Sequence, residues 1–356
     1  MNSPKIWLGL LFGAIGLALA FWGVSLGDLA EAFRTMELFW LLPIGVVFML
    51  QQVLRASRQL ILTRPLAPEM TWRNSFSILC ISFFFINTLP ARLGELLRPA
   101  LFWQRESIPI GAGFGVVFIE RLIDLLFTLI VLWMVIAWVP LHSEHLPFGG
   151  QQIPVVEWAS AVLLRVVPAI LTVVLALAFF GRRIVALLER WTEGREAGRV
   201  RTLLTLGARF ATTFVDALHT LRDPRRLFGV LAYTFVIWTM TGFMYIWLAT
   251  ALGVEHLIGY GEGMGILVIT MLATALPAPP GFAGVYEAAA RGALLLFGVA
   301  GGHLDAVAVA YALVIHWWQF IVQSTSAFYF LWVDGLSLDR VRQLMRQART
   351  GEGAGS

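Results

Sequence analysis

The sequence of 356 residues is too apolar for a water-soluble globular protein. Hydrophobic residues make up 58% of the chain and charged residues only 13%, about half of the charged share usual in soluble domains. The mean hydropathy of +0.78, with 14 Trp and 26 Phe, indicates a polytopic integral membrane protein, because about 20 apolar residues span the bilayer core as a helix. This composition excludes secreted, nucleic-acid-binding and disordered classes, although the formal net charge is +4.

Long apolar stretches predict an all-α polytopic membrane protein. Six of them are expected to cross the bilayer completely: about 6–25, 39–62, 110–140, 161–180, 227–251 and 303–333. The first is long enough to span and is not followed by a convincing cleavage site, so we interpret it as a membrane helix and not as a signal peptide. Residues 1–333 are expected to form one transmembrane domain, followed by a basic cytoplasmic tail at 334–356.

Two further apolar segments, 75–103 and 263–300, are broken by Leu-Pro pairs followed by glycines. Non-helical backbone at membrane depth is tolerated where it is buried in protein or lines a cavity. We therefore expect two re-entrant helical hairpins, and the sequence leaves open whether each goes halfway or all the way across. Their expected hinge positions are Pro90, Gly94, Pro277, Pro279, Pro280, Gly281 and Gly284.

The placement of arginine predicts the orientation. The loops at 25–38, 141–160 and 252–262 are poor in arginine, whereas 181–226 holds ten arginines against five acidic residues. Because cytoplasmic loops carry the excess of Lys and Arg, hairpins that enter from opposite sides put every loop on its expected side. Both termini are then cytoplasmic in a bacterial inner membrane. The 181–226 stretch is expected to form amphipathic helices at the inner interface.

The two broken segments share a local pattern. Residues 89–94 read LPARLG and residues 276–281 read LPAPPG, and each is followed by an acid and then a base, Glu95 with Arg98 and Glu287 with Arg291. Chance similarity between apolar segments is one explanation. Together with opposite entry sides, the pattern is typical of the inverted repeats of transporters, whose broken helices form a binding site near the membrane midplane.

Several ionisable residues lie inside the apolar segments, where burial of each costs about 2.5–3.5 kcal/mol or more. They are expected either to form structural ion pairs, with Arg55 and Arg58 reaching the inner interface, or to line a hydrated cavity that holds a charged lipid headgroup. Arginine offers a planar donor fork for phosphate, and half-helix ends add anion-binding capacity. The candidate substrate-binding residues are Arg55, Arg58, Arg92, Glu95, Arg98, Glu120, Arg121, Asp124, Glu287 and Arg291.

Other chemistry has little support. Cys80 lies in an apolar run, and the pair His142 and His145 is expected to be a solvated pair in an outer loop, so we expect no metal site and no cofactor. Motifs for nucleotide binding or nucleophilic catalysis are missing. His316, beside two tryptophans in the last span, is expected to make an interhelical hydrogen bond.

Four motifs follow one another along the chain: Arg55-x-x-Arg58, the run NTLPARLGE from Asn87 to Glu95 with Arg98, Glu120-Arg121-x-x-Asp124, and Pro277-x-Pro279-Pro280-Gly281-x-x-Gly284-x-x-Glu287. This set resembles the lysylphosphatidylglycerol synthase transmembrane-region family, also called flippase-like domain proteins. The resemblance implies lipid translocation across a membrane, and it adds Asn87 to the candidate substrate-binding residues.

The expected function is a lipid flippase or transporter that moves a phosphate-bearing lipid or a lipid-linked intermediate. The alternatives are a membrane enzyme acting on a polyprenyl phosphate or phospholipid, with Glu95 or Glu120 as general base, and a non-catalytic subunit of a cell-envelope synthase. The expected partners are membrane phospholipids or polyprenyl-phosphate-linked lipids, a separate synthase and a second copy of the chain, because Gly9 and Gly13 could seat another helix.

Overall fold

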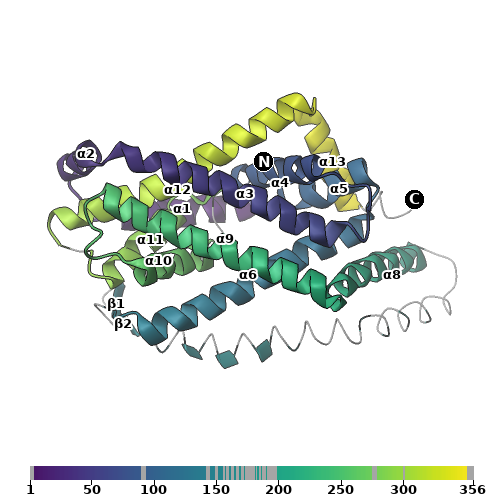
Figure 1. Cartoon of the computed structure of the whole chain (residues 1–356), viewed down its shortest axis with the longest axis horizontal. Coiled ribbons are helices and arrows are strands. Elements are labelled where there is room, and N and C mark those ends of the chain that lie inside the picture. The colour runs from purple at the N-terminus through teal and green to yellow at the C-terminus, as the bar shows by residue number, and fades with distance from the viewer. Residues whose placement is uncertain are drawn as a thin grey trace.

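The computed structural model describes residues 4–350 except 90–93, 142–144, 149–150, most of 155–198, 275–278 and 300. These described residues are almost entirely helical, and Figure 1 shows α3, α6 and α9 running along the long axis of the molecule. The helices in the first half are α1 (Pro4–Phe21), α2 (Leu26–Thr35), α3 (Leu41–Thr63), α4 (Trp72–Thr88), α5 (Leu97–Glu106) and α6 (Ile110–Trp138). Those in the second half are α8 (Arg199–Leu218), α9 (Pro224–Ala251), α10 (Tyr260–Ala273), α11 (Val285–Leu296), α12 (His303–Val333) and α13 (Leu338–Thr350).

Short elements complete the description. The 3-10 turns η1 (Leu38–Trp40), η3 (His219–Arg222) and η4 (Pro280–Phe282) precede or follow longer helices. An antiparallel hairpin of β1 (His145–Phe148) and β2 (Gln151–Pro154) lies in the expected outer loop. The all-α expectation omitted this hairpin, because four-residue strands give too short a pattern to predict.

Three described helices are both long and apolar enough to cross a membrane: Leu38–Thr63, α9 and α12. A fourth candidate is the pair α1 and α2, which is bent by 79°. α6 is 29 residues long and carries Glu120, Arg121 and Asp124 near its middle. The expected span at 161–180 lies mostly outside the described residues.

The segment 25–38 differs from its expectation as a loop. It holds helix α2, whose first turn is capped by Ser25, since the Ser25 hydroxyl accepts hydrogen bonds from the N–H groups of Gly27 and Asp28 at 3.2 and 3.4 Å. Leu29 and Ala32 are buried on one face of α2. A capping serine followed by such a face is a helix signal, which charge counting alone passed over.

Both proline-broken segments consist of two helices that pack against each other, α4 with α5 and α10 with α11. A Cβ atom at Gly94 would collide with the backbone of Phe85 and Ile86, so only glycine lets the chain after the first break lie against α4. At the second break Gly281 and Gly284 have φ values of +71° and +84°, a conformation that favours glycine. The two breaks meet, because the end of α4 contacts η4.

Two apolar cores flank this meeting point. One joins α9, α10, α11 and α12, and the other joins α3, α4, α5 and the first half of α6. α1 packs against the second break through Gly16, where a Cβ atom would lie 2.5 Å from the Gly284 carbonyl carbon. α8 packs along the start of α6 through Phe210 and Phe214. Residues of α3, α4, α6, α10, α11 and α12 surround the region between the cores.

Candidate functional site

A buried ion pair joins α3 to α6. The Arg58 guanidinium donates to both carboxylate oxygens of Asp124, at 2.6 and 3.0 Å, and to the Thr234 hydroxyl of α9 at 2.8 Å. Arg58 is only 2% exposed. Such a bidentate arrangement is the strong form of the arginine–carboxylate interaction. The Arg58–Asp124 pair therefore ties three long helices together.

A second buried pair joins α5 to α6. Arg98 Nη1 lies 2.6 Å from Glu120 Oε2, and Arg98 Nε donates to Gln59 Oε1 at 2.7 Å. Gln59 in turn donates to the Ser75 hydroxyl at 2.8 Å. Arg98 is 1% exposed and Glu120 4%. We refer to these two ion pairs, Arg58–Asp124 and Arg98–Glu120, as the closed pairs. These pairs fit the expectation that ionisable residues in the apolar segments form structural ion pairs.

Beside the closed pairs lies a cavity of about 340 Å³. It is situated where the two breaks meet, since Asn87 at the end of α4, Gly281 and Phe282 of η4 and Tyr286 of α11 all line it. α3, α6, α10 and α12 supply the remaining walls. The lining residues with polar side chains are Gln52, Arg55, Asn87, Glu95, Arg121, Asp124, Thr128, Thr274, Tyr286, His316, Gln319 and Gln323.

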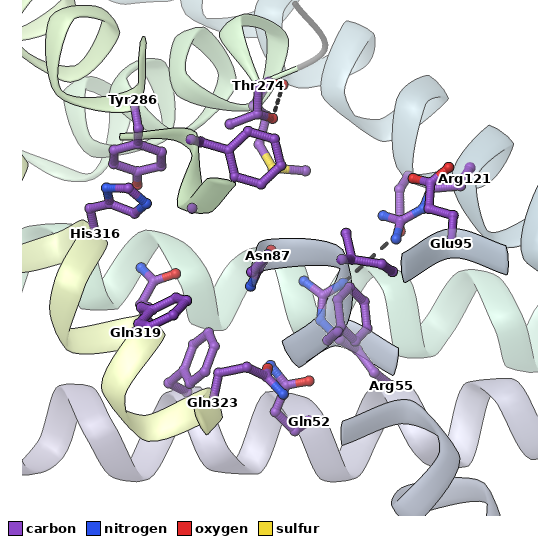
Figure 2. Close-up of a pocket in the computed structure, with 18 of the residues that line it drawn as sticks. Gln52, Arg55, Asn87, Glu95, Arg121, Thr274, Tyr286, His316, Gln319 and Gln323 are labelled. Carbon is purple, nitrogen blue, oxygen red and sulfur yellow. Dashed lines mark hydrogen bonds and ion pairs between the residues drawn. The ribbon is translucent and has the colours of Figure 1, made fainter. Parts of the chain in front are cut away.

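One end of the cavity is charged. Figure 2 shows Arg55, Glu95 and Arg121 gathered there. Arg55 lies 4.0 Å from Asp124, whose carboxylate is already held by Arg58. The guanidinium carbons of Arg55 and Arg121 lie 5.9 and 5.4 Å from the centre of the Phe83 ring, within the range of a cation–π contact. We refer to this region as the charged end.

Arg121 is the least neutralised arginine of the charged end. Its Nε is buried and, like the Nε of Arg58, has no hydrogen-bond partner in the described part of the chain, but Arg58 has Asp124 and Thr234 as partners of its other nitrogens. Among the described residues around this point, the four arginines Arg55, Arg58, Arg98 and Arg121 face the three carboxylates Glu95, Glu120 and Asp124. One positive charge is therefore in excess, which suits an anionic ligand.

The opposite end of the cavity is uncharged apart from a carboxylate behind it. His316 Nδ1 lies 2.8 Å from Glu287 Oε1, and Glu287 Oε2 accepts the Gly284 N–H at 2.7 Å. The Tyr286 ring stacks on His316 at 4.3 Å, and its hydroxyl lies 3.0 Å from that of Tyr245. The hydrogen bond expected of His316 between two helices is confirmed, with α11 as the partner. Glu287 thus fixes the second break and orients the imidazole.

The cavity brings together only part of the candidate substrate-binding set. Arg55, Asn87, Glu95, Arg121 and Asp124 line it. Arg58, Arg98 and Glu120 lie behind it in the closed pairs, and Glu287 is joined to it through His316. Arg291 lies elsewhere: it donates to the carbonyls of Leu19 and Ala20 and is 3.7 Å from Asp305. Arg92, Pro90 and Pro277 lie outside the described residues.

The sequence reasoning missed the uncharged lining residues, among them Gln52, Gln319, Gln323 and Tyr286. The search for intramembrane charges could not find them, because they carry no charge. The useful signal would have been several carboxamides within apolar spans. In the described ranges, no three His, Cys, Asp or Glu side chains come together as metal ligands would.

Fold and site together define an integral membrane protein with a cavity, charged at one end, between its two proline-broken segments. Residues 6–327 match the family described as Lysylphosphatidylglycerol synthase TM region, and the chain belongs to this family. Membership indicates a membrane protein with a lipid-related function. No curated protein and no solved structure matches the chain.

Proposed function

We propose that this protein is a lipid flippase or transporter that binds the phosphate of an anionic or zwitterionic lipid, or of a lipid-linked intermediate, and moves the headgroup across the bilayer. The observation that carries this proposal is the cavity between the two breaks, where Arg55 and Arg121 line the charged end and Arg121 Nε has no partner in the described part of the chain. A phosphate diester would fill that role and share one site with both guanidinium groups.

The geometry suggests how such a site releases its cargo. Asp124 and Glu95 prevent the charged end from binding phosphate too tightly, because a carboxylate competes with the phosphate for the same guanidinium groups. The acyl chains stay in lipid while only the headgroup enters. The glycines of the second break, Gly281 and Gly284, are the bending points at which α11 could move relative to α10. The lipid is moved without bond making or breaking.

The proposed location is the bacterial inner membrane, with both termini in the cytoplasm. The arginine-rich stretch around α8 and the basic tail support this orientation, since cytoplasmic segments carry the excess of arginine. The partners would be membrane phospholipids or polyprenyl-phosphate-linked lipids, a separate lipid synthase and a second copy of this chain.

The test is a liposome assay with purified protein and fluorescent phospholipids or polyprenyl phosphates. Loss of inner-leaflet label to a membrane-impermeant quencher measures translocation. We expect wild-type protein to move at least one phosphate lipid, and Arg121→Gln to slow that movement about tenfold or more, since about 1.4 kcal/mol of phosphate binding corresponds to a factor of ten. Arg73→Gln is the control, because Arg73 is half exposed and contacts Asp334, outside the cavity.

A folded protein that moves no lipid in this assay would contradict the proposal. It would favour the other expectations, a lipid-modifying enzyme or a subunit of an envelope synthase. Unchanged movement in Arg121→Gln would show that the charged end does not bind the headgroup.

A further inference from the structure

Four carboxamide side chains line the cavity between the charged end and His316. Gln52 comes from α3, Asn87 from α4, and Gln319 and Gln323 from α12. Figure 2 shows them lying around one space, with Asn87 near its centre. We refer to these four residues as the amide group. Three different helices thus place uncharged carboxamide groups in one cavity.

The amide group is poorly satisfied by the protein. Gln52 is 4% exposed, and its Oε1 has no hydrogen-bond partner in the part of the chain that the structure describes. Within the same part, Asn87 and Gln319 make no hydrogen bond either. Gln323 donates once, to the Cys80 carbonyl at 3.3 Å. Asn87 and Gln319 are partly exposed, so the unsatisfied atom that the protein buries is Gln52 Oε1, and a buried polar atom without a partner is unfavourable.

Other glutamines of the same helix are satisfied. Gln51, directly before Gln52, donates to the Thr241 hydroxyl at 3.0 Å. Gln59, two turns later, binds both Ser75 and Arg98. Helix α3 therefore pairs its glutamines where they face protein and leaves one unpaired where it faces the cavity. This contrast points to a ligand as the partner of the amide group.

The chemistry of that ligand follows from the side chains. A carboxamide offers two N–H donors and a carbonyl acceptor without charge, which matches hydroxyl groups that both donate and accept. An ammonium group would need a carboxylate, but at this end of the cavity Glu287 is already held by Gly284 and His316. The rings of Phe48, Phe282 and Phe320 add apolar faces for C–H groups.

We propose that the transported lipid carries a hydroxyl-rich, uncharged unit, a sugar or polyol, esterified to its phosphate, and that the amide group binds this unit while Arg55 and Arg121 hold the phosphate. This inference rests on the proposed function and names its substrate class. At about 340 Å³, the cavity is at the lower end of the ~300–1,000 Å³ usual for small-molecule sites. This volume is enough for a single such unit.

Binding of water-soluble headgroup analogues to purified full-length protein in detergent tests this directly. The probes are glycerophosphoinositol, glycerophosphoglycerol and glycerophosphoethanolamine, which share one phosphodiester and differ only in the headgroup. Calorimetric titration is expected to show at least one of the two hydroxyl-rich diesters binding about tenfold more tightly than the ethanolamine diester. Equal affinity for all three diesters, or a preference for the ethanolamine diester, would overturn the proposal.

The variants Gln319→Leu and Asn87→Leu sharpen the result. Each is expected to lower the preference for the hydroxyl-rich diester about fivefold, because one net hydrogen bond contributes roughly 1 kcal/mol. The matched control is Gln51→Leu, next to the amide group but bonded to Thr241, which should retain the preference. Thermal unfolding shows whether each variant is folded. A preference unchanged in both amide variants would overturn the role of the amide group.

The same titrations separate this inference from the proposed function. If Arg121→Gln weakens all three diesters while none is preferred, the phosphate site stands and the hydroxyl-rich substrate class is wrong. If no diester binds to folded protein, both proposals are wrong.

Discussion

The closed pairs and the charged end of the cavity consist of the same types of side chain, arginines and carboxylates, in the same part of the membrane domain. The partners of the arginines differ between the two regions. Arg58 is held by both oxygens of Asp124 and by Thr234. The Nε of Arg58 and the Nε of Arg121 both lack a partner in the described residues, but the contact of Arg121 is with the Phe83 ring and not with a carboxylate as in Arg58. The acceptors around an intramembrane arginine, and not its depth, therefore decide whether the protein itself neutralises it.

The largest effect is expected from breaking a closed pair. Arg58→Gln should lower the free energy of unfolding by about 3–5 kcal/mol, because it leaves the buried Asp124 carboxylate without its bidentate partner. Thermal or denaturant unfolding in detergent measures this loss. The double variant Arg58→Met with Asp124→Leu should recover most of the stability, since replacing a whole buried pair by apolar residues is often neutral. A single variant as stable as wild type would show that the closed pair is not structural.

An intermediate effect should separate two glutamines of α3. Gln59→Leu is expected to lower the free energy of unfolding by about 1.5–3 kcal/mol, because it removes an acceptor from the buried guanidinium of Arg98. Gln52→Leu, which removes an amide with an unpaired oxygen, should change stability by less than about 1 kcal/mol. Unfolding of the two variants side by side gives the comparison. Equal losses would mean that Gln52 has a structural partner.

The smallest effect is expected at the end of α12, outside the membrane-spanning helices. Asp334 accepts hydrogen bonds from Arg73 and Arg105, each at 2.8 Å, and from Ser77. Burial alone would raise the pKa of Asp334, but these hydrogen bonds and the charge of Arg105 lower it below its ordinary 3.8. Asp334→Asn should cost about 1 kcal/mol at neutral pH, since Arg73 is half exposed and water screens the pair.

The acid dependence of this contribution follows from the lowered pKa. The stabilisation is fully present above pH 3.8 and is lost as the pH falls through the lower folded-state value. Wild type should therefore lose its advantage over Asp334→Asn in acid, as measured by unfolding midpoints across the pH range. A constant difference at every pH would assign the effect to packing instead.

The position of the two breaks was accessible from the sequence, because Pro90, Pro277 and the glycines after them cannot continue a regular helix. The contact between the two breaks could not be predicted from the sequence. The contact of α4 with η4 and the close approach of Gly16 in α1 to Gly284 both join residues that are far apart along the chain. Hydropathy also passed over α2, whose signal is a serine cap and a narrow apolar face.

The sequence by itself determined that this is a membrane protein, which segments are apolar enough to lie in the bilayer, and which arginines and carboxylates must find partners there. Composition and the length of the apolar segments give this information, because a charge in lipid is costly unless it is paired or hydrated. Only the tertiary structure decided that Arg58 and Arg98 are neutralised while Arg121 faces a cavity, and that four uncharged amides face the same space. A hydrogen bond requires two groups within about 3 Å of each other, and helices distant in the sequence supply those groups.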